Sequence, residues 1–387
     1  MVWLVAAALL WRTRVPDNLR LPHLDPDDYF GRRVLGRASH FDRGERRLWV
    51  GGTLTQLVVL AAVALFGRRI AAGFELGRVG TGVMVGTFVT LMLWLAGLPF
   101  GFLGLWWERR YGLSSQSYDA WAFEQWPSLL AQVVGLTILL TVLMLLAGRF
   151  PRSWWLIAAP LLVAVTAGLV VVLALAARID VHPIRNAAVA ADVRKLERKE
   201  GVSGTPVRIE TVSDHTTAIN GETVGLGSTT IVVLWDTLFK SGLSRRAIDF
   251  VAAHELGHVA RRHLWKGVGW SVLFTFPLLF LVAEATRRRG GFGLPEVVPF
   301  GLLVISVLGL LVTPLGNVIS RRYEAEADWM ALRATRDPSA AREAFHRFTS
   351  GDLAQPTSPL WAYVMLDDHP TVMQRLAMTR TWERRNR

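Results

Sequence analysis

The chain has no cysteine among its 387 residues. This absence excludes disulfide bonds, thiolate metal ligands and cysteine nucleophiles, so any metal must be bound by histidine and carboxylate side chains. Charge is also scarce, at 19% of the residues, whereas 51% are hydrophobic and the mean hydropathy is +0.32. The apolar residues form long runs that almost lack charge, which is typical of a membrane protein and not of an ordinary soluble domain.

Six of these runs are predicted to cross the membrane as helices, for which about 20 residues are needed. They cover residues 49–66, 82–105, 129–146, 154–176, 267–283 and 297–315. Tryptophans lie at the ends of several runs, as in the aromatic belt at a membrane surface. Pro277 and Pro314 are expected to kink or end the last two helices. Residues 2–11 are apolar but short, and the sequence leaves open whether they cross the membrane.

The formal net charge is +12, and the basic residues lie in loops beside the apolar runs. With six spans, all the long polar segments fall on one side, including residues 12–47 with their nine arginines. The positive-inside rule therefore predicts a multi-pass protein of the cell (plasma or inner) membrane, with these segments in the cytoplasm. Contact with anionic membrane lipids explains the charge better than nucleic acid does, because no base-reading module is visible.

The predicted organisation has five parts. A basic N-terminal segment is followed by four spans with a polar loop near 106–127, a water-soluble part, two further spans and a C-terminal polar part. Their boundaries are 1–48, 49–177, 178–266, 267–316 and 317–387. The water-soluble part contains an amphipathic pattern at 187–200, and β-branched runs at 207–212 and 230–235 predict strands. The fold class is therefore mainly α, with a small α+β part beside the membrane helices.

The strongest motif is His254-Glu255-Leu256-Gly257-His258, on a predicted helix that Ser244 can cap. Four residues of helix place both imidazoles on one face, where they can bind one zinc ion. Glu255 can then reach a water molecule and act as a general base, as in metalloproteases. The alternative is a chance match on a surface helix.

A zinc ion in a catalytic site usually takes a third protein ligand. Glu324 is the candidate, and Asp328 lies four residues on, where it can accept a hydrogen bond from the free nitrogen of a liganding histidine. The alternative for Glu324 is a solvated carboxylate paired with Arg321. Glu326 is the rival ligand, but on a helix its side chain points roughly 160° away from the face that Glu324 and Asp328 share.

These motifs resemble those of the type I CAAX prenyl protease family, which are integral-membrane zinc metalloendopeptidases related to the HtpX-type proteases. The matching residues are Asn220, Gly225, Gly227, His254, Glu255, His258, His263, Ser320, Arg321, Glu324, Ala327, Asp328, His369, Pro370 and Arg375. The resemblance covers roughly residues 50–380. It implies a zincin-like metalloprotease domain and one Zn²⁺ ion per chain.

The resemblance also implies roles for residues that spacing alone does not single out. Asn220 would hold the substrate on an edge strand, while His369 and Arg375 would stabilise the oxyanion. Without the resemblance, the last two would be taken for a surface turn and a solvated arginine. His263 is expected to pack or cap, because five helical residues from His258 turn it to the far side. The family's Ala-Tyr after the asparagine is Gly-Glu here, which leaves the substrate preference open.

The sequence thus predicts a membrane-embedded zinc endopeptidase that acts on membrane-associated or lipidated proteins. Its role would be CAAX-type processing or quality control of membrane proteins, and an arginine-rich composition that suggests a bacterial source favours the second. One alternative is a transporter with a chance motif, which would carry polar residues within its spans. The other is a catalytically inactive scaffold, which the intact set of His254, Glu255, His258 and Glu324 argues against.

Overall fold

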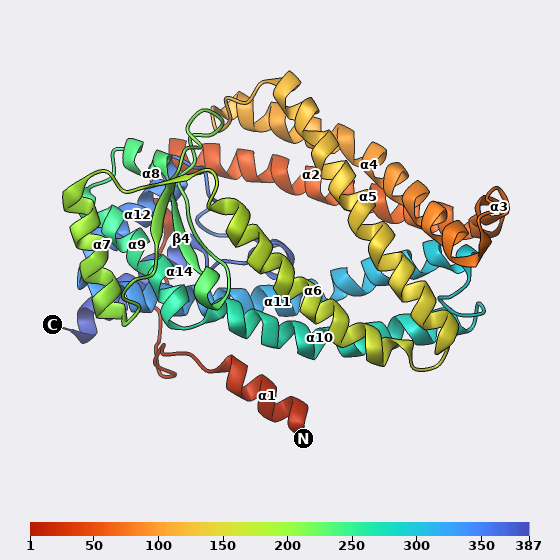
Figure 1. Ribbon diagram of the computed structural model, residues 1–387. Coiled ribbons are helices and arrows are strands. Elements are labelled where there is room, and N and C mark those ends of the chain that lie inside the picture. Colours follow the sequence, from red (N-terminus) through yellow and green to blue (C-terminus); the bar gives the residue numbers. More distant parts are fainter. Residues whose placement is uncertain (387) are drawn as a thin grey trace.

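The computed structural model describes residues 1–386, so residue 387 of the predicted C-terminal part lies outside the described residues. The molecule is elongated (Figure 1). A small sheet and several helices form one end, and long helices extend from it to the opposite end, where the short helix α3 (Gly67–Ala72) lies. The predicted combination of membrane helices with a small α+β part is confirmed.

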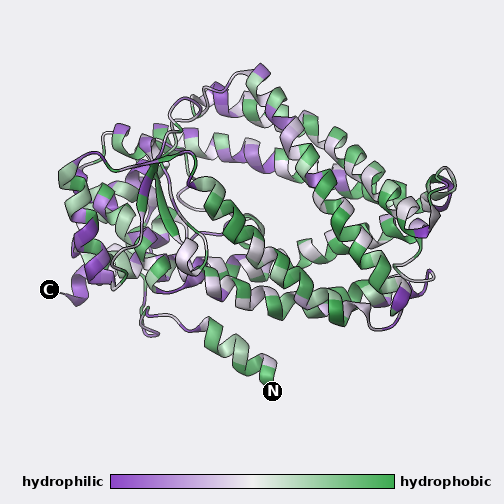
Figure 2. Ribbon diagram, viewed as in Figure 1, coloured by the Kyte–Doolittle hydropathy of each residue, from purple (hydrophilic) through white to green (hydrophobic). Residues whose placement is uncertain are grey.

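Six of the described helices are long and apolar enough to cross a membrane. They are α2 (Arg32–Leu65), α4 (Gly77–Tyr111), α5 (Tyr118–Arg149), α6 (Trp154–Ala177), α10 (His263–Arg287) and α11 (Val298–Thr335). Figure 2 shows apolar residues along most of α4, α5, α6 and α10, whereas the first part of α2 and the last part of α11 are polar. Many of the apolar side chains are exposed, as expected where lipid tails and not protein cover a helix.

One helix begins earlier than predicted, and two helices do not end where a proline was expected to kink or end them. Helix α2 begins at Arg32, well before the predicted span, because the residues in between are mostly good helix formers without proline. Helices α10 and α11 continue through Pro277 and Pro314 and do not end there. A proline removes one N–H, and packing against neighbouring helices makes this loss tolerable inside a membrane helix.

The N-terminal residues form the ten-residue helix α1 (Val2–Trp11), followed by the 3₁₀ turn η1 (Pro26–Asp28). Helix α1 lies beside α10 (Figure 1), and the ring of Trp3 meets that of Phe276 edge-on at 6.3 Å. The chain after α1 then runs back to the sheet-containing end. This path brings the N-terminal segment close to residues that are more than 300 positions away in sequence.

The sheet has four strands in the order β1-β2-β4-β3, which places β3 at an edge. The strands are β1 (Val181–Pro183), β2 (Val207–Glu210), β3 (Gly221–Val224) and β4 (Ile231–Trp235). Strand β4 is parallel to β2 and antiparallel to β3. The predicted strands at 207–212 and 230–235 and the predicted helix at 187–200, which is α7 (Ala187–Glu200), are confirmed.

The remaining helices and turns lie at the sheet-containing end, except η3, which contacts α3 at the opposite end. They are η2 (Gly227–Thr229), α8 (Asp236–Lys240), α9 (Arg245–Ala260), η3 (Pro295–Val297), α12 (Pro338–Ser350), α13 (Leu360–Met365) and α14 (Val372–Arg385). One apolar core joins the sheet, α7, α9, the end of α11, α12 and α14. Within it Phe250 of α9 meets Phe345 of α12 edge-on at 5.3 Å.

Gly257 explains how closely α9 approaches α11. A Cβ atom at this position would lie 3.2 Å from Met330 Cβ and 3.4 Å from Ala327 Cα. Glycine is unfavourable inside a helix by about 1 kcal/mol relative to alanine, so its presence here reflects the contact and not helix propensity. The core and this contact together fix the side chains that project from α9 toward α11.

Candidate metal centre

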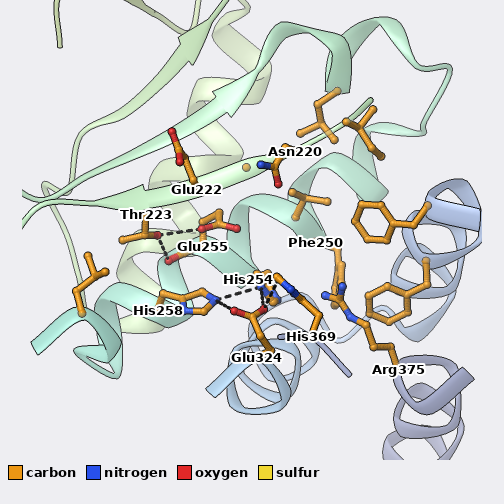
Figure 3. Close-up of a pocket in the computed structure, with 17 residues that line it drawn as sticks. Asn220, Glu222, Thr223, Phe250, His254, Glu255, His258, Glu324, His369 and Arg375 are labelled. Carbon is orange, nitrogen blue, oxygen red and sulfur yellow. Dashed lines mark hydrogen bonds and ion pairs between the residues drawn. The ribbon is translucent and has the colours of Figure 1, made fainter. Parts of the chain in front are cut away.

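Helix α9 carries the His-Glu-x-x-His motif, and Ser244 caps its N-terminus. The Ser244 hydroxyl accepts a hydrogen bond from the backbone N–H of Ala247 at 3.2 Å. The helix is buried along most of its length, so His254 and Glu255 are both only 7% exposed. His254 and His258 project from the same face, one turn apart, toward α11 (Figure 3).

Three candidate ligand atoms meet between α9 and α11. The Nε2 atoms of His254 and His258 are 3.2 Å apart, and Glu324 carboxylate oxygens lie 3.1 Å from the first and 3.5 Å from the second. Ligands on a tetrahedral zinc ion at about 2.0–2.1 Å are about 3.3 Å from one another. The spacing of the three atoms therefore fits a single zinc ion held by two histidines and one carboxylate.

The charges around His254 also fit a cation. Burial lowers the pKa of His254, but hydrogen bonds and charge interactions with Asp328 and Glu324 outweigh it and raise the pKa to about 10. The surroundings thus favour positive charge at this imidazole. Arg321, which the alternative interpretation paired with Glu324, instead donates to the backbone carbonyls of Tyr363 (2.7 Å) and Asp367. Glu324 is therefore directed at the two histidines and is not paired with Arg321.

Asp328 lies directly behind His254. Its Oδ1 atom is 2.9 Å from His254 Nδ1 and accepts a hydrogen bond from Arg375 Nη2 at 2.6 Å, while Oδ2 accepts from Arg375 Nε at 2.8 Å. Asp328 is 1% exposed, and the Arg375 guanidinium lies over the ring of Phe345 at 4.3 Å. Arg375 lines the cavity that lies in front of the three candidate ligand atoms, and it is paired with Asp328 through two of its nitrogens.

Glu255 points into the cavity beside the three ligands (Figure 3). Thr223 Oγ1 on β3 lies 3.0 Å from Glu255 Oε2 and 2.9 Å from the Glu255 backbone oxygen, and its hydroxyl donates to one of these acceptors. The sequence contained no signal for Thr223, because the contact depends on how β3 lies over α9. Gly221 matters for the same reason: a Cβ there would be 3.1 Å from Glu255 Cγ.

His369 lies on the opposite side of the ligand set from β3. Its Nε2 atom is 3.3 Å from Glu324 Oε2, and its Nδ1 atom donates to Asp368 Oδ1 at 2.7 Å. Burial opposes protonation, but Asp368 and Glu324 outweigh it and raise the pKa of His369. Asp368 was not singled out from the sequence, although its place directly before the His-Pro pair was visible.

His263 packs, as expected, with its ring stacked on Tyr323, but it does not lie on the far side of the helix, where helical spacing placed it. The structure ends α9 at Ala260 and starts α10 at His263, with Arg262 between them in the left-handed conformation (φ 53°). The turn brings His263 back toward the site, so that its Nδ1 atom lies 3.0 Å from His258 Nδ1. Glu326 points away from the three ligands, as predicted, and its Oε2 atom is 3.0 Å from His263 Nε2.

The site opens into a cavity of about 350 Å³. Its walls include Asn220, Glu222, the histidines of α9, Glu324 and His369 (Figure 3). A second cavity of about 780 Å³ lies between α2 and α11 and is lined by Asp368, the neighbour of His369. The candidate site therefore adjoins a hollow among the apolar helices.

Comparisons with known proteins agree with this geometry. Residues 183–383 match peptidase family M48. The chain is 26% identical, over 301 residues, to an uncharacterized metalloprotease of Bacillus subtilis (strain 168), YhfN, and the match covers 74% of this chain and 70% of that protein. The crystal structure of S. mikatae Ste24p has the same fold, with a TM-score of 0.79 at 19% identity, over 98% of this chain and 96% of the other.

The motif resemblance is thus confirmed at the level of the family. The matched region contains the candidate ligands on α9 and α11, and the fold likeness extends over the membrane helices. Membership implies a divalent metal ion, typically zinc, and peptide or protein substrates. The chain belongs to peptidase family M48 and is a multi-pass membrane metalloendopeptidase.

Proposed function

We propose that His254, His258 and Glu324 bind one zinc ion per chain and that the site hydrolyses peptide bonds of membrane proteins. The observation that carries the proposal is the meeting of these three side chains, whose ligand atoms lie within 4.8 Å of one another although they come from two helices. Their spacing matches tetrahedral zinc, and the absence of cysteine leaves histidine and carboxylate as the available strong ligands.

Glu255 is the proposed general base. A zinc ion at this site supplies Lewis acidity, which polarises the peptide carbonyl and acidifies water. Glu255 accepts the proton of the attacking water and transfers it to the leaving amine nitrogen. The hydroxyl of Thr223 restricts the Glu255 carboxylate, which is buried and therefore needs little reorganisation. General acid–base catalysis of this kind contributes about 10²–10⁴-fold.

His369 is the proposed donor to the oxyanion, oriented by Asp368. Its raised pKa and its position beside Glu324 support this role. Arg375 contributes positive charge at the same side of the cavity while holding Asp328, which in turn holds His254 by the bond to Nδ1. A liganding histidine needs such a partner to fix its tautomer and ring orientation.

The substrate is proposed to pair with β3, with Asn220 beside it. The backbone carbonyl of Asn220 accepts from Trp235 N on β4 at 3.0 Å, so the main-chain groups of Gly221 and Thr223 alternate with it and face the free edge. A peptide added at this edge would lie along the cavity that contains Glu255. Glu222 is exposed on this strand, where it would favour basic substrate side chains.

The proposed role is quality control or processing of membrane proteins on the cytoplasmic side of a cell membrane. Two observations support it. The hollow of about 780 Å³ among the helices adjoins the site, and residues 12–47, with their nine arginines, begin at the sheet-containing end of the molecule that holds the site. Lipidated, CAAX-type substrates are the narrower form of the same proposal. They rest on the motif resemblance, because the hollow is lined by charged side chains such as Asp42, Glu45 and Arg46 as well as by apolar ones.

The test is zinc content and peptide cleavage by the full-length protein purified in detergent, beside Glu255→Gln and Glu324→Gln. We expect one zinc ion per chain in the wild type and in Glu255→Gln, and cleavage by the wild type alone. Peptides with and without a farnesylated C-terminal cysteine separate CAAX-type processing from general proteolysis. A wild-type protein that binds no zinc would contradict the proposal.

A further inference from the structure

Glu326 is a fully buried carboxylate next to the metal centre that the proposed mechanism does not use. Its Oε1 atom accepts from the backbone N–H of Arg14 at 2.6 Å and from Arg261 Nε at 2.7 Å. Its Oε2 atom lies 3.0 Å from His263 Nε2 and 3.3 Å from Lys266 Nζ. A buried carboxylate with four donors, two of them cationic, remains ionised and acts only as an acceptor.

The position of Glu326 determines where His263 carries its proton. A histidine that binds a metal ion through Nε2 carries its proton on Nδ1, and that proton needs an acceptor. Glu326 contacts Nε2 of His263 on the other side of the ring and thereby turns the lone pair of His263 Nδ1 toward His258. That lone pair lies 3.0 Å from His258 Nδ1. We therefore assign the proton in this contact to His258 Nδ1, which leaves the lone pair of His258 Nε2 free for a metal ion.

We propose that Glu326 and His263 are positioning residues that hold His258 in the tautomer and ring orientation needed for metal binding. The inference rests on the proposed ligation by His258 and deepens it. The two histidines of α9 are then supported differently: His254 donates directly to the carboxylate of Asp328, whereas His258 reaches a carboxylate only through a second imidazole.

The N-terminal segment, residues 10–14, completes this arrangement. Three consecutive carbonyl oxygens of the segment accept hydrogen bonds from side chains of α10 and α11. Leu10 accepts from Tyr323 at 2.7 Å, Trp11 from Arg322 at 2.7 Å and Arg12 from Lys266 at 3.1 Å. These contacts place the N–H of Arg14 against Glu326, so the start of the chain supplies one of the four donors that fix this carboxylate.

Packing alone could also hold His263, since its ring stacks on Tyr323 with the centroids 4.6 Å apart and the planes 9° apart. The experiment must therefore separate hydrogen bonding from shape. Asparagine places its Oδ1 atom where the histidine has Nδ1 and retains an acceptor for His258, whereas leucine fills space without an acceptor. For the segment, Arg14→Pro removes the N–H, and Arg14→Ala keeps it.

We would measure zinc affinity by competition with a chelator, and the visible spectrum of the cobalt(II) form, in full-length protein carrying Glu255→Gln. This background retains the proposed metal ligands and excludes any contribution from turnover. We expect zinc affinity to fall about 10–100-fold in His263→Leu, with a changed cobalt spectrum, and to recover in His263→Asn. A smaller loss of a few fold is expected for Glu326→Gln and Arg14→Pro, and none for Arg14→Ala.

Zinc affinity within twofold of the parent in His263→Leu would overturn the inference, as would an equal loss in His263→Leu and His263→Asn. If His263→Leu does not fold, the comparison of Arg14→Pro with Arg14→Ala tests the inference instead. Equal zinc affinity in these two variants would contradict it, because the N–H that Arg14 donates to Glu326 would then have no effect on metal binding. A parent protein that binds no zinc would instead contradict the proposed function. Failure of the inference and failure of the function are therefore distinguishable.

Discussion

Helix α11 has two halves that differ in what surrounds their side chains. The first half is an apolar span, where Leu311 is 67% exposed and Leu315 is 55% exposed. In the second half the charged residues Glu324, Glu326 and Asp328 are buried, and each contacts named partners on other elements. Lipid accepts any apolar side chain, whereas a buried charge requires one particular arrangement.

The comparison shows that the two halves of one helix tolerate substitution to very different degrees. In the span, replacing one apolar side chain by another leaves the contacts with lipid nearly unchanged. In the buried half, each substitution leaves a donor or a charge without its partner, and the cost is large because water cannot replace it. The following changes test this difference, from the largest expected effect to the smallest.

The largest effect is expected for Glu324→Gln, which removes the charge of the proposed third ligand. Partners of metal ligands typically contribute 10–100-fold to metal affinity, so a ligand itself should contribute more. We expect no retained zinc after dialysis and no peptide cleavage, measured by metal analysis and a fluorogenic peptide. Glu255→Gln is the matched control because it should lose cleavage and keep its zinc; zinc retained equally by both variants would contradict the ligand assignment.

Asp328→Asn should weaken the site and the fold together. The substitution leaves Arg375 buried without a carboxylate, and breaking a buried pair is unfavourable by about 3–5 kcal/mol. We expect a marked fall in the unfolding temperature and a 10–100-fold weaker zinc affinity. Thermal unfolding with and without a chelator measures both, and an unchanged unfolding temperature would show that the pair is not a main support of α11.

Removal of zinc should destabilise the folded protein measurably. A ligand that binds only the folded state at 1,000 times its dissociation constant stabilises it by about 4 kcal/mol. We expect a strong chelator to lower the unfolding temperature of the wild type, and zinc in excess to restore it. Glu324→Gln should show no such difference, and a chelator effect of wild-type size in that variant would place the metal elsewhere.

Thr223→Val tests the contact above Glu255 and should have a smaller effect. The substitution preserves shape and removes a hydroxyl that lies 2.9 Å from the Glu255 backbone oxygen and 3.0 Å from Glu255 Oε2. A hydrogen bond to the carboxylate, which is a charged group, would be worth about 1.5–3 kcal/mol. We expect kcat to fall about tenfold with zinc content unchanged. The result that contradicts this role is full activity, whereas a loss of zinc would indicate a disturbance of α9 as a whole.

The smallest effect is expected for Leu311→Ala, in the apolar half of α11. Its side chain is mostly exposed to lipid, so the unfolding free energy should change by less than about 0.5 kcal/mol. Thermal unfolding and cleavage should both resemble the wild type. A loss comparable to that of Asp328→Asn would show that this surface packs against protein and would remove the contrast between the two halves.

The sequence predicts the features that depend on local pattern. Hydropathy located the six spans, and the capped His-Glu-x-x-His motif located the helix that α9 confirms. The four-residue spacing of Glu324 and Asp328 also predicted that both would face the same neighbour. These successes share a cause, since each needs only the periodicity of one helix and its caps.

The sequence could not predict contacts that depend on how elements meet. His263 was placed by continuing one helical wheel, but Arg262 adopts a left-handed conformation and starts a new helix there. Thr223 and the N–H of Arg14 reach the site from a strand and from the start of the chain, and neither position carries a local signature. Such contacts follow from tertiary packing, which a single sequence does not encode in its periodicity.

The most direct test of the central claim is the cleavage rate of the wild type and of Glu255→Gln, compared at equal zinc content. We predict one zinc ion per chain in both proteins and a cleavage rate at least 100-fold lower in Glu255→Gln, since general base catalysis contributes about 10²–10⁴-fold. Equal cleavage rates in the two zinc-loaded proteins would contradict the account, because the hydrolysis would then not use this site.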